Sequence, residues 1–322
     1  MKKSLKLSAA LFLILLCSCS GTNTNVQNSA TQIYFDTAVT LTADCSDEVL
    51  SAAFSLCEKY EKTLSRTRED SEVSLINSGS KTAGRDTLEV IGKGLYYSSL
   101  TGGKFDITVA DLTSLWDFKY EIVPSRDEIA EALKNIDYQS VELSGDTIDT
   151  NGKKIDLGGI AKGYVSDKLL EYFKSEDVKQ GIINLGGNVT VFGDRFYKVG
   201  IKKPFSDGDV FATLSLKNKS VSTSGTYERC FEKDGVTYHH ILDTETGYPA
   251  ETDLLSASVI GDTSADCDAL STVCILYGLE KANALINETH GFEAVFIDKD
   301  YRLSFTDGLE IKDGIIALKT DL

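Results

Sequence analysis

A carboxylate and a hydroxyl stand four residues apart in an otherwise apolar segment near the C-terminal end of the chain. Asp268 and Thr272 lie within residues 266–277, whose other side chains are typical of a buried helix. Because four residues make slightly more than one helical turn, both side chains project from the same face. A carboxylate beside a neutral oxygen suits a hard divalent cation that keeps its remaining positions for substrate phosphates. The pair therefore predicts a cation site on this helix.

A glycine-rich segment offers a place for the phosphates themselves. Residues 156–164 place Gly158, Gly159, Lys162 and Gly163 where a strand is expected to pass into a helix. Glycine lets the backbone approach a ligand, a helix start offers free N–H groups, and lysine adds positive charge. The order of a Walker loop and the GxGxxG pattern are both absent, so an ordinary turn remains the alternative.

A second glycine turn is followed at once by an aromatic ring and a carboxylate. Phe105 and Asp106 come directly after Gly102-Gly103 and Lys104. The phenyl ring can stack on a planar ligand, and the carboxylate can accept a hydrogen bond from a ligand N–H. The alternative is a helix C-terminus that leads into a strand.

Histidine is scarce, with three in the chain, and His239 and His240 are adjacent. Neighbours in a strand point to opposite faces, which disfavours a shared metal ion. His240 is a candidate general base, because the pKa of histidine lies near working pH. The alternative is a structural histidine whose ring nitrogens are satisfied by the protein.

The N-terminal residues predict export. Met1-Lys2-Lys3 precedes a short apolar run, which is typical of a secretory signal, and Leu16-Cys17-Ser18-Cys19 resembles a bacterial lipobox. We expect a signal peptide over residues 1–18, a lipid on Cys19 and a flexible tether over residues 19–30. The protein is then held on the extracytoplasmic side of a bacterial cell membrane by its lipid alone. An ordinary signal peptide with two incidental cysteines is the alternative.

Composition indicates an ordinary globular chain, with 42% apolar and 25% charged residues. The net charge of −16 argues against nucleic acid and anionic lipid as direct partners. Three prolines and no low-complexity interior favour a single domain over residues 31–322. The cysteines beyond Cys19 lack CxxC spacing, so they predict neither a zinc framework nor a definite disulfide.

Hydrophobic periodicity and capping residues predict a mixed α and β chain. Ser46 before two acidic residues marks one helix start, and Ser125 with Glu128 forms a capping box at another. Helices are expected over residues 46–64, 87–100, 125–135 and 163–173, and strands over residues 32–43, 181–185, 188–192, 197–201, 211–216, 220–224, 254–261 and 293–298. Short turns between adjacent strands indicate an α+β fold of largely antiparallel sheets with packed helices.

Taken together and in this order, these segments resemble the ApbE family of flavin transferases from about residue 35 to residue 285. The resemblance rests on residues 35–37, 64–74, 103–109 with 115–118, 156–164, 185–188, 222–225, 240–249 and 268–272. It implies a T-fold-related domain. Family members use Mg²⁺ to cleave FAD, attach its FMN half to a Thr or Ser hydroxyl of a partner flavoprotein, and release AMP. Many are exported lipoproteins, and the acceptors implied are exported flavoproteins such as redox-pump subunits or extracellular reductases.

The resemblance also implies a role for individual residues. The metal site carries over to the side chains of Asp268 and Thr272 and to backbone oxygens of Gly159 and Ser271, with Asp268 essential for catalysis. The flavin-nucleotide site carries over to Phe35, Thr67, Lys104, Phe105, Asp106, Asp156, Lys162 and Leu242. His240 matches the histidine proposed as base for the acceptor hydroxyl.

One position departs from the family pattern. Thr67 stands where many relatives carry an aromatic residue near the adenine. Variation at this position is linked within the family to whether FAD is transferred or hydrolysed, so an FAD pyrophosphatase that yields FMN and AMP is the first alternative. A flavin-binding lipoprotein without chemistry is the second.

Overall fold

The computed structural model describes residues 27–206 and 208–321. The predicted signal peptide over residues 1–18 and the lipid site at Cys19 lie outside the described residues. The first strand begins at Asn28, so residues 28–30, expected in the tether, are part of the folded domain. Within the described residues, none of the helices combines the length and apolar character needed to cross a bilayer.

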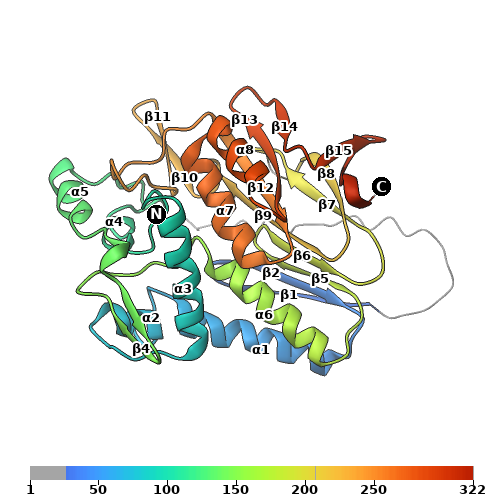
Figure 1. The fold of residues 1–322 in the computed structure, drawn as a ribbon, viewed down its shortest axis with the longest axis horizontal. Coiled ribbons are helices and arrows are strands. Elements are labelled where there is room, and N and C mark those ends of the chain that lie inside the picture. Colours follow the sequence, from blue (N-terminus) through green and yellow to red (C-terminus); the bar gives the residue numbers. More distant parts are fainter. Residues whose placement is uncertain (1–26, 207, 322) are drawn as a thin grey trace, which may run out of the picture.

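An eight-stranded sheet runs through the centre of the domain in the order β1-β2-β5-β6-β9-β12-β13-β14 (Figure 1). Every neighbouring pair in it is antiparallel. Its strands are β1 (Asn28–Tyr34), β2 (Thr37–Ala43), β5 (Gly181–Leu185), β6 (Asn188–Phe192), β9 (Lys219–Gly225), β12 (Leu254–Gly261), β13 (Glu293–Asp298) and β14 (Leu303–Phe305).

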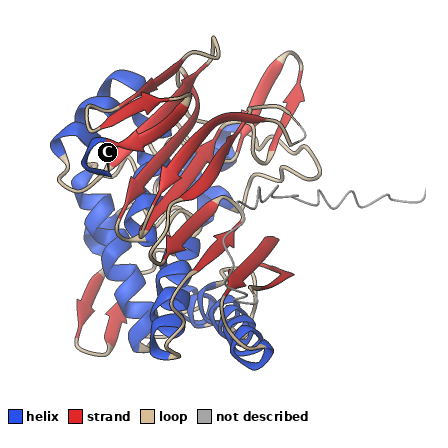
Figure 2. Cartoon of the chain, turned by 90° about the vertical axis from the view of Figure 1, so that its right-hand side faces the viewer, coloured by secondary structure: helices blue, strands red, loops and turns tan. Residues whose placement is uncertain are grey.

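A four-stranded sheet packs on one face of this central sheet (Figure 2). Its order is β15-β16-β8-β7, with one parallel pair between β16 and β8. The apolar layer between the sheets takes Val221, Ile260 and Val295 from the central sheet and Ile201 and Leu214 from the smaller one. The strands are β7 (Tyr197–Lys202), β8 (Val210–Leu216), β15 (Leu309–Lys312) and β16 (Ile315–Leu318); two separate hairpins are β3–β4 (Glu142–Ser144, Thr147–Asp149) and β10–β11 (Cys230–Lys233, Val236–His239).

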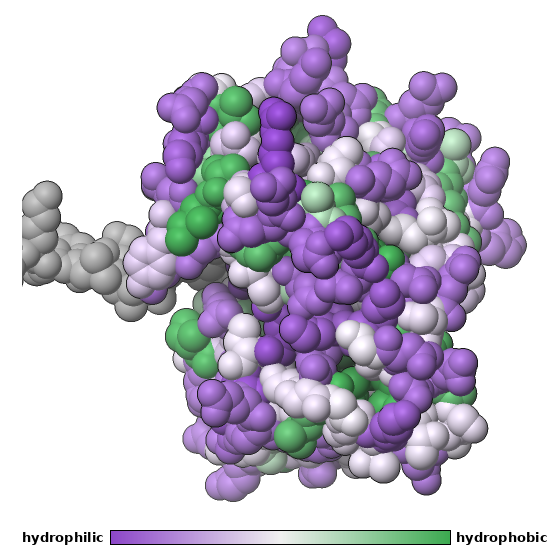
Figure 3. All heavy atoms as spheres, turned by 90° about the vertical axis from the view of Figure 1, so that its left-hand side faces the viewer, coloured by the Kyte–Doolittle hydropathy of each residue, from purple (hydrophilic) through white to green (hydrophobic). Residues whose placement is uncertain are grey.

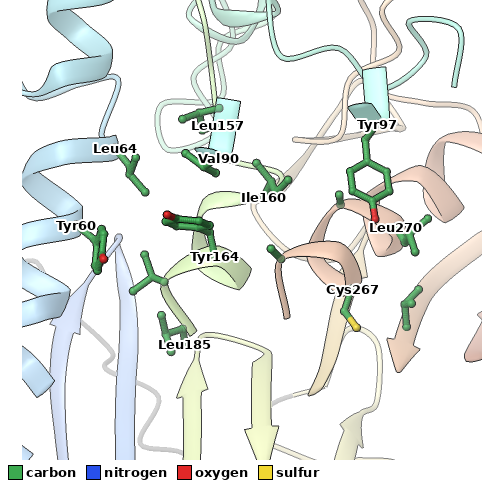
Figure 4. Packing of buried hydrophobic residues seen from close by; sticks show 14 of the residues in the cluster. Tyr60, Leu64, Val90, Tyr97, Leu157, Ile160, Tyr164, Leu185, Cys267 and Leu270 are labelled. Atoms are coloured by element: carbon green, nitrogen blue, oxygen red, sulfur yellow. The ribbon is translucent and has the colours of Figure 1, made fainter. Parts of the chain in front are cut away.

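Helices cover the other face of the central sheet and enclose the main core (Figure 1). The α-helices are α1 (Asp47–Leu64), α2 (Glu72–Asn77), α3 (Arg85–Leu100), α4 (Ala110–Thr113), α5 (Arg126–Leu133), α6 (Ala161–Ser175), α7 (Ser264–Tyr277) and α8 (Leu279–Glu288), and short 3₁₀ turns lie at Tyr138–Ser140 and Lys319–Asp321. Figure 4 shows how Tyr60 of α1, Tyr97 of α3, Tyr164 of α6 and Leu270 of α7 meet in this core. The predicted α+β architecture is confirmed.

Two local predictions are wrong, and so is the strand in the alternative interpretation of the Gly102-Gly103 turn. The strand expected over residues 32–43 is a hairpin, because Phe35 and Asp36 both adopt φ of 55° and turn the chain between β1 and β2. No strand follows the glycine turn at Gly102-Gly103; residues up to Val109 form turns. Likewise, the segment before α6 is a loop joined to Val109 by one isolated bridge at Lys154, not a strand.

Candidate active site

The buried carboxylate of Asp268 lies where the first turns of α6 and α7 cross. Its Oδ2 accepts a hydrogen bond from the backbone N–H of Gly163 at 2.9 Å. Gly163 is required for this crossing, because a Cβ there would lie 2.2 Å from the carbonyl oxygen of Ser264. The second oxygen, Oδ1, accepts the hydroxyl of Ser222 at 3.2 Å, and Ser222 also contacts Asn188 Oδ1.

A group of hydroxyls lies one turn further along α7. Ser224 Oγ of β9 is 2.8 Å from Ser271 Oγ and 3.2 Å from Thr272 Oγ1. Ser271 also donates to the carbonyl oxygen of Asp268. The predicted pair on α7 therefore does face one site, and β9 adds hydroxyls to it.

The glycine turn before α6 lies against the same hydroxyls. A Cβ on Gly159 would be 3.8 Å from Thr272 Oγ1 and 2.9 Å from the ring of Phe105. Gly159 therefore brings its backbone into contact with Phe105 and close to Thr272, as only a residue without a side chain can. The other three predicted metal-site residues, Gly159, Ser271 and Thr272, are thus brought together with Asp268. Phe105 lies beside them.

These residues fit a hard divalent cation. The side-chain atoms of Asp268, Ser271 and Thr272 that could bind a metal are oxygens, which Mg²⁺ prefers to nitrogen or sulfur. Asp268 is 4% exposed and forms no ion pair with the described Lys, Arg or His side chains. A buried carboxylate without a counter-charge is costly unless a cation neutralises it. No group of three or more His, Cys, Asp or Glu side chains suited to a metal occurs among the described residues, so a cation here depends on Asp268 and neutral oxygens.

Lys104 joins the glycine turn to the segment after His240. Its Nζ lies 2.7 Å from Asp243 Oδ2 and 3.1 Å from Glu245 Oε2, and Thr244 Oγ1 donates to the carbonyl of Gly103. These two acidic partners raise the pKa of Lys104, although burial acts in the opposite sense. Lys104 therefore links the loop after α3 to residues 243–245, and its charge is already paired with two carboxylates.

Asp106 is buried and bonded within its own loop. Oδ1 accepts the N–H and the hydroxyl of Thr108, both at 2.7 Å, and Oδ2 accepts the N–H of Tyr138. Burial raises the pKa of Asp106, and these hydrogen bonds oppose the rise. The structure therefore gives Asp106 a clear role in shaping the loop that carries Phe105.

Asp156 holds the glycine turn in place from the other side. Its Oδ1 accepts the N–H of Gly158 at 2.8 Å, while Oδ2 lies 2.8 Å from Arg66 Nε and from Thr113 Oγ1. Lys162, in the first turn of α6, places Nζ 3.4 Å from the carbonyl of Gly158 and forms no ion pair with the described residues. Lys162 is thus a cation at this turn whose charge is open to a ligand.

The structure shows no contact between the remaining predicted nucleotide residues and Asp268 or its hydroxyl neighbours among the described residues. Thr67 is exposed, and its hydroxyl lies 3.1 Å from that of Ser65. Phe35 lies on the β1–β2 turn, where its N–H donates to Glu61 of α1; no hydrogen bond or ion pair in the described chain joins it to the other site residues. Leu242 is buried in a separate cluster that includes Trp116.

His240 comes directly after β11 rather than within it. Its Nδ1 lies 3.0 Å from the carbonyl oxygen of Glu228, and the ring of Phe118 meets it edge to face. Burial, followed by the positive charges of Arg229 and Lys162, lowers the pKa of His240 to about 4. The expectation of a pKa near working pH is therefore wrong. His239 is the satisfied structural histidine, bonded to Ala250 and Ile241.

Four contributors to this site lie in segments that the sequence singles out, but no contact with Asp268 or its neighbours was predicted for them. Gly163 and Ser222 form hydrogen bonds with Asp268. Ser224 contacts Ser271, and Asn188 contacts Ser222. The alternating serines at 220, 222 and 224 in a predicted strand were the available signal, because alternate residues share one face. Asn188 is 2% exposed, and its Nδ2 has no partner among the described residues.

Two hollows elsewhere on the surface do not contain the predicted residues. One of about 550 Å³ lies between α3 and α6, and one of about 360 Å³ lies between α5 and residues 246–248. Figure 3 shows the side of the molecule on the left of Figure 1 as mainly hydrophilic, with small separate hydrophobic patches.

Comparison with known proteins shows the family of the chain. Residues 34–296 match the model of the ApbE family. The chain is 33% identical over 288 residues to the FAD:protein FMN transferase of Treponema pallidum (strain Nichols), covering 81% of this chain and 80% of that protein. It is 35% identical over 266 residues to that of Klebsiella pneumoniae (strain 342), covering 79% and 84%.

Solved structures show the same fold. The crystal structure of the ApbE protein from Thermotoga maritima MSB8 superposes with a TM-score of 0.80 at 32% identity, covering 87% of this chain and 97% of that one. The apo form of Pseudomonas stutzeri flavinyl transferase ApbE gives 0.77 at 26% identity, covering 87% and 95%. With the family model matched across most of the sequence, and with the Treponema pallidum and Klebsiella pneumoniae relatives above 30% identity, the chain belongs to the ApbE family.

Proposed function

We propose that this protein transfers the FMN half of FAD to a Thr or Ser hydroxyl of an acceptor flavoprotein and releases AMP in a reaction that requires Mg²⁺. The observation that carries the proposal is the buried Asp268 carboxylate, which has no cationic partner among residues 27–206 and 208–321 and faces a group of hydroxyls. The name shared by the curated relatives, FAD:protein FMN transferase, supports the same reaction.

Asp268 and Thr272, with backbone oxygens of Gly159 and Ser271, are the residues that would hold the metal. Bound there, Mg²⁺ would stabilise negative charge on the pyrophosphate and on the departing AMP. Lys162 adds a positive charge at the first turn of α6, where the positive end of the helix dipole also favours an anion. Phe105, fixed against Gly159, offers a ring edge or face to the planar parts of FAD.

His240 is the residue that would accept the proton of the acceptor hydroxyl. The carbonyl of Glu228 accepts a hydrogen bond from Nδ1, and this leaves Nε2 as the basic nitrogen. With a pKa of about 4, the ring is neutral at neutral pH and ready to accept a proton. Its low basicity makes it a weaker base than an ordinary histidine, and a metal held by Asp268 and Thr272 would assist it by stabilising the developing charge.

The acceptor and the location of the protein follow from the family and from the N-terminal residues. We infer export, a lipid on Cys19, and a bacterial membrane anchor facing the extracytoplasmic side. Exported acceptors such as a redox-pump subunit or an extracellular reductase would then share the compartment of this enzyme.

Hydrolysis of FAD is the second candidate function, and Thr67 favours it. Thr67 is an exposed hydroxyl side chain at the position where the family resemblance implies an aromatic ring. Without that ring, less of the adenine end is covered, and water can compete with an acceptor hydroxyl for the same phosphorus.

One assay separates these functions. The domain lacking residues 1–26 is incubated with FAD and Mg²⁺, with and without an acceptor protein, and AMP and protein-bound flavin fluorescence are measured. Transfer predicts AMP that depends on the acceptor and a fluorescent acceptor; hydrolysis predicts AMP without it. Recovery of intact FAD in every mixture would leave only a binding function. If the affinity for FAD were the same with Mg²⁺ and with excess chelator, the metal would be removed from the proposal.

Replacing His240 with alanine is expected to slow transfer by about a hundredfold or more while leaving FAD affinity nearly unchanged. Because burial lowers the pKa of His240 to about 4, the rate should stay level down to about pH 5 and fall only as the neutral imidazole is lost. A pH–rate profile at saturating FAD and Mg²⁺ measures both effects.

The exposed His290 provides the matched control, since His290→Ala removes the same ring outside the site. It should retain the wild-type rate. A rate that halves near pH 6.5, the ordinary histidine value, would contradict the lowered pKa of His240. Equal losses of rate and FAD affinity in His240→Ala would reduce His240 to a structural residue.

A further inference from the structure

Helices α6 and α7 exchange carboxylates at their N-terminal turns. Asp268 of α7 accepts the N–H of Gly163 in the first turn of α6, and Asp167 of α6 accepts the N–H groups of Ser264 and Ala265 at 2.7 and 2.9 Å. Neither helix has a side-chain cap from its own preceding residue. Each carboxylate therefore satisfies N–H groups that the other helix leaves open.

The two halves of this exchange have the same spacing. Asp167 follows Gly163 by four residues, and Asp268 follows Ser264 by four, so each pair lies on one helix face. The missing side chain of Gly163 lets the backbones meet. Figure 4 shows Tyr164 of α6 and Cys267 of α7 in the core beside this crossing.

Asp167 is well placed to control the cation site without touching it. Its two hydrogen bonds fix the first two N–H groups of α7, and Asp268 lies within the next turn of that helix. A rotation of the first turn would move the Asp268 carboxylate away from Gly163 and turn Thr272 away from Gly159. Burial raises the pKa of Asp167 to about 6, so the carboxyl group is mostly ionised at neutral pH and above.

We infer that Asp167 is a positioning residue for the cation site, which orients Asp268 and Thr272 through the first turn of α7. The inference rests on the proposed function, because it takes Asp268 to hold the metal. Groups that orient metal ligands typically change metal affinity by about 10- to 100-fold when they are removed.

The test compares Asp167→Ala and Asp167→Asn with the wild-type protein in calorimetric titrations with Mg²⁺, and in AMP release as a function of Mg²⁺ concentration. Asp167→Ala should bind Mg²⁺ about 10- to 100-fold more weakly. Its kcat should recover at saturating Mg²⁺, because Asp167 does not touch the reacting groups. Asp167→Asn should lose less affinity, since the amide oxygen still accepts one of the two N–H groups.

Asp253 provides a matched control for the loss of a helix cap. Its Oδ1 accepts the N–H of Leu279 at 2.8 Å at the start of α8, which also lacks a side-chain cap from its own preceding residue. Asp253→Ala should lower the melting temperature in the same way as Asp167→Ala, but it should leave Mg²⁺ affinity at the wild-type value.

Wild-type Mg²⁺ affinity in Asp167→Ala would overturn the inference and leave Asp167 as a packing residue. If the alanine variant does not fold, the asparagine variant decides by the same comparison. These outcomes leave the proposed function intact as long as the wild-type protein binds Mg²⁺ and cleaves FAD. A wild-type protein that binds no Mg²⁺ would overturn both.

Discussion

Asp268→Asn is expected to abolish Mg²⁺-dependent cleavage of FAD, with kcat reduced at least about a hundredfold. The amide keeps the shape of the side chain and an oxygen for the Gly163 N–H, but it removes the negative charge that would hold the metal. Without Mg²⁺ the variant should be more stable than the wild-type protein, because a buried charge without a cationic partner is removed. Thermal melts with and without Mg²⁺ measure this, and the stabilisation by Mg²⁺ should disappear.

Asp266 is the control on the same helix. Its carboxylate lies 3.1 Å from Lys93 of α3, so its charge already has a partner. Asp266→Asn should keep both activity and the stabilisation by Mg²⁺. Full turnover in Asp268→Asn, or a melting temperature that still rises with Mg²⁺, would show that the metal is held elsewhere or is not needed.

Most elements could be predicted from the sequence, because their signals are local. Ser46 caps α1, and Ser125 with Glu128 forms the capping box of α5, as expected from their spacing. β5 and β6 have the predicted bounds, since apolar runs flank Gly186-Gly187. The hairpin at residues 35–36 was missed because its turn contains no glycine: both Phe35 and Asp36 take a positive φ that side chains seldom adopt.

Residue spacing alone could bring together only those site residues that lie on one helix. The spacing of Asp268 and Thr272 puts both on one face of α7 whatever lies opposite. Ser222 and Ser224 depend on how β9 lies under that helix, which is a long-range property of the sheet. The lowered pKa of His240 likewise arises from burial and from Arg229 and Lys162, whose proximity only the fold determines.

Gly163→Ala is expected to destabilise the protein by about 3 kcal/mol and to weaken Mg²⁺ binding with it. The added Cβ would lie 2.2 Å from the carbonyl oxygen of Ser264 and 2.7 Å from Cα of Ala265, and backbone atoms cannot turn aside as a side chain can. The two helices must therefore separate, which lengthens the bond from the Gly163 N–H to Asp268 and disturbs both N–H groups bound by Asp167. Urea unfolding and Mg²⁺ titration measure the two losses.

Gly92 in α3 shows what the same substitution does without a contact. A Cβ there would meet only Leu143 Cδ1, at an ordinary 3.7 Å. Because alanine is favoured over glycine inside a helix, Gly92→Ala should stabilise the protein by up to about 1 kcal/mol. Helix propensity alone favours alanine at both positions. If Gly163→Ala destabilises the protein and Gly92→Ala stabilises it, the lost stability must come from the α6–α7 contact. If Gly163→Ala were instead neutral, α6 and α7 could separate without harm, and close backbone packing would not be what holds Asp268 in place.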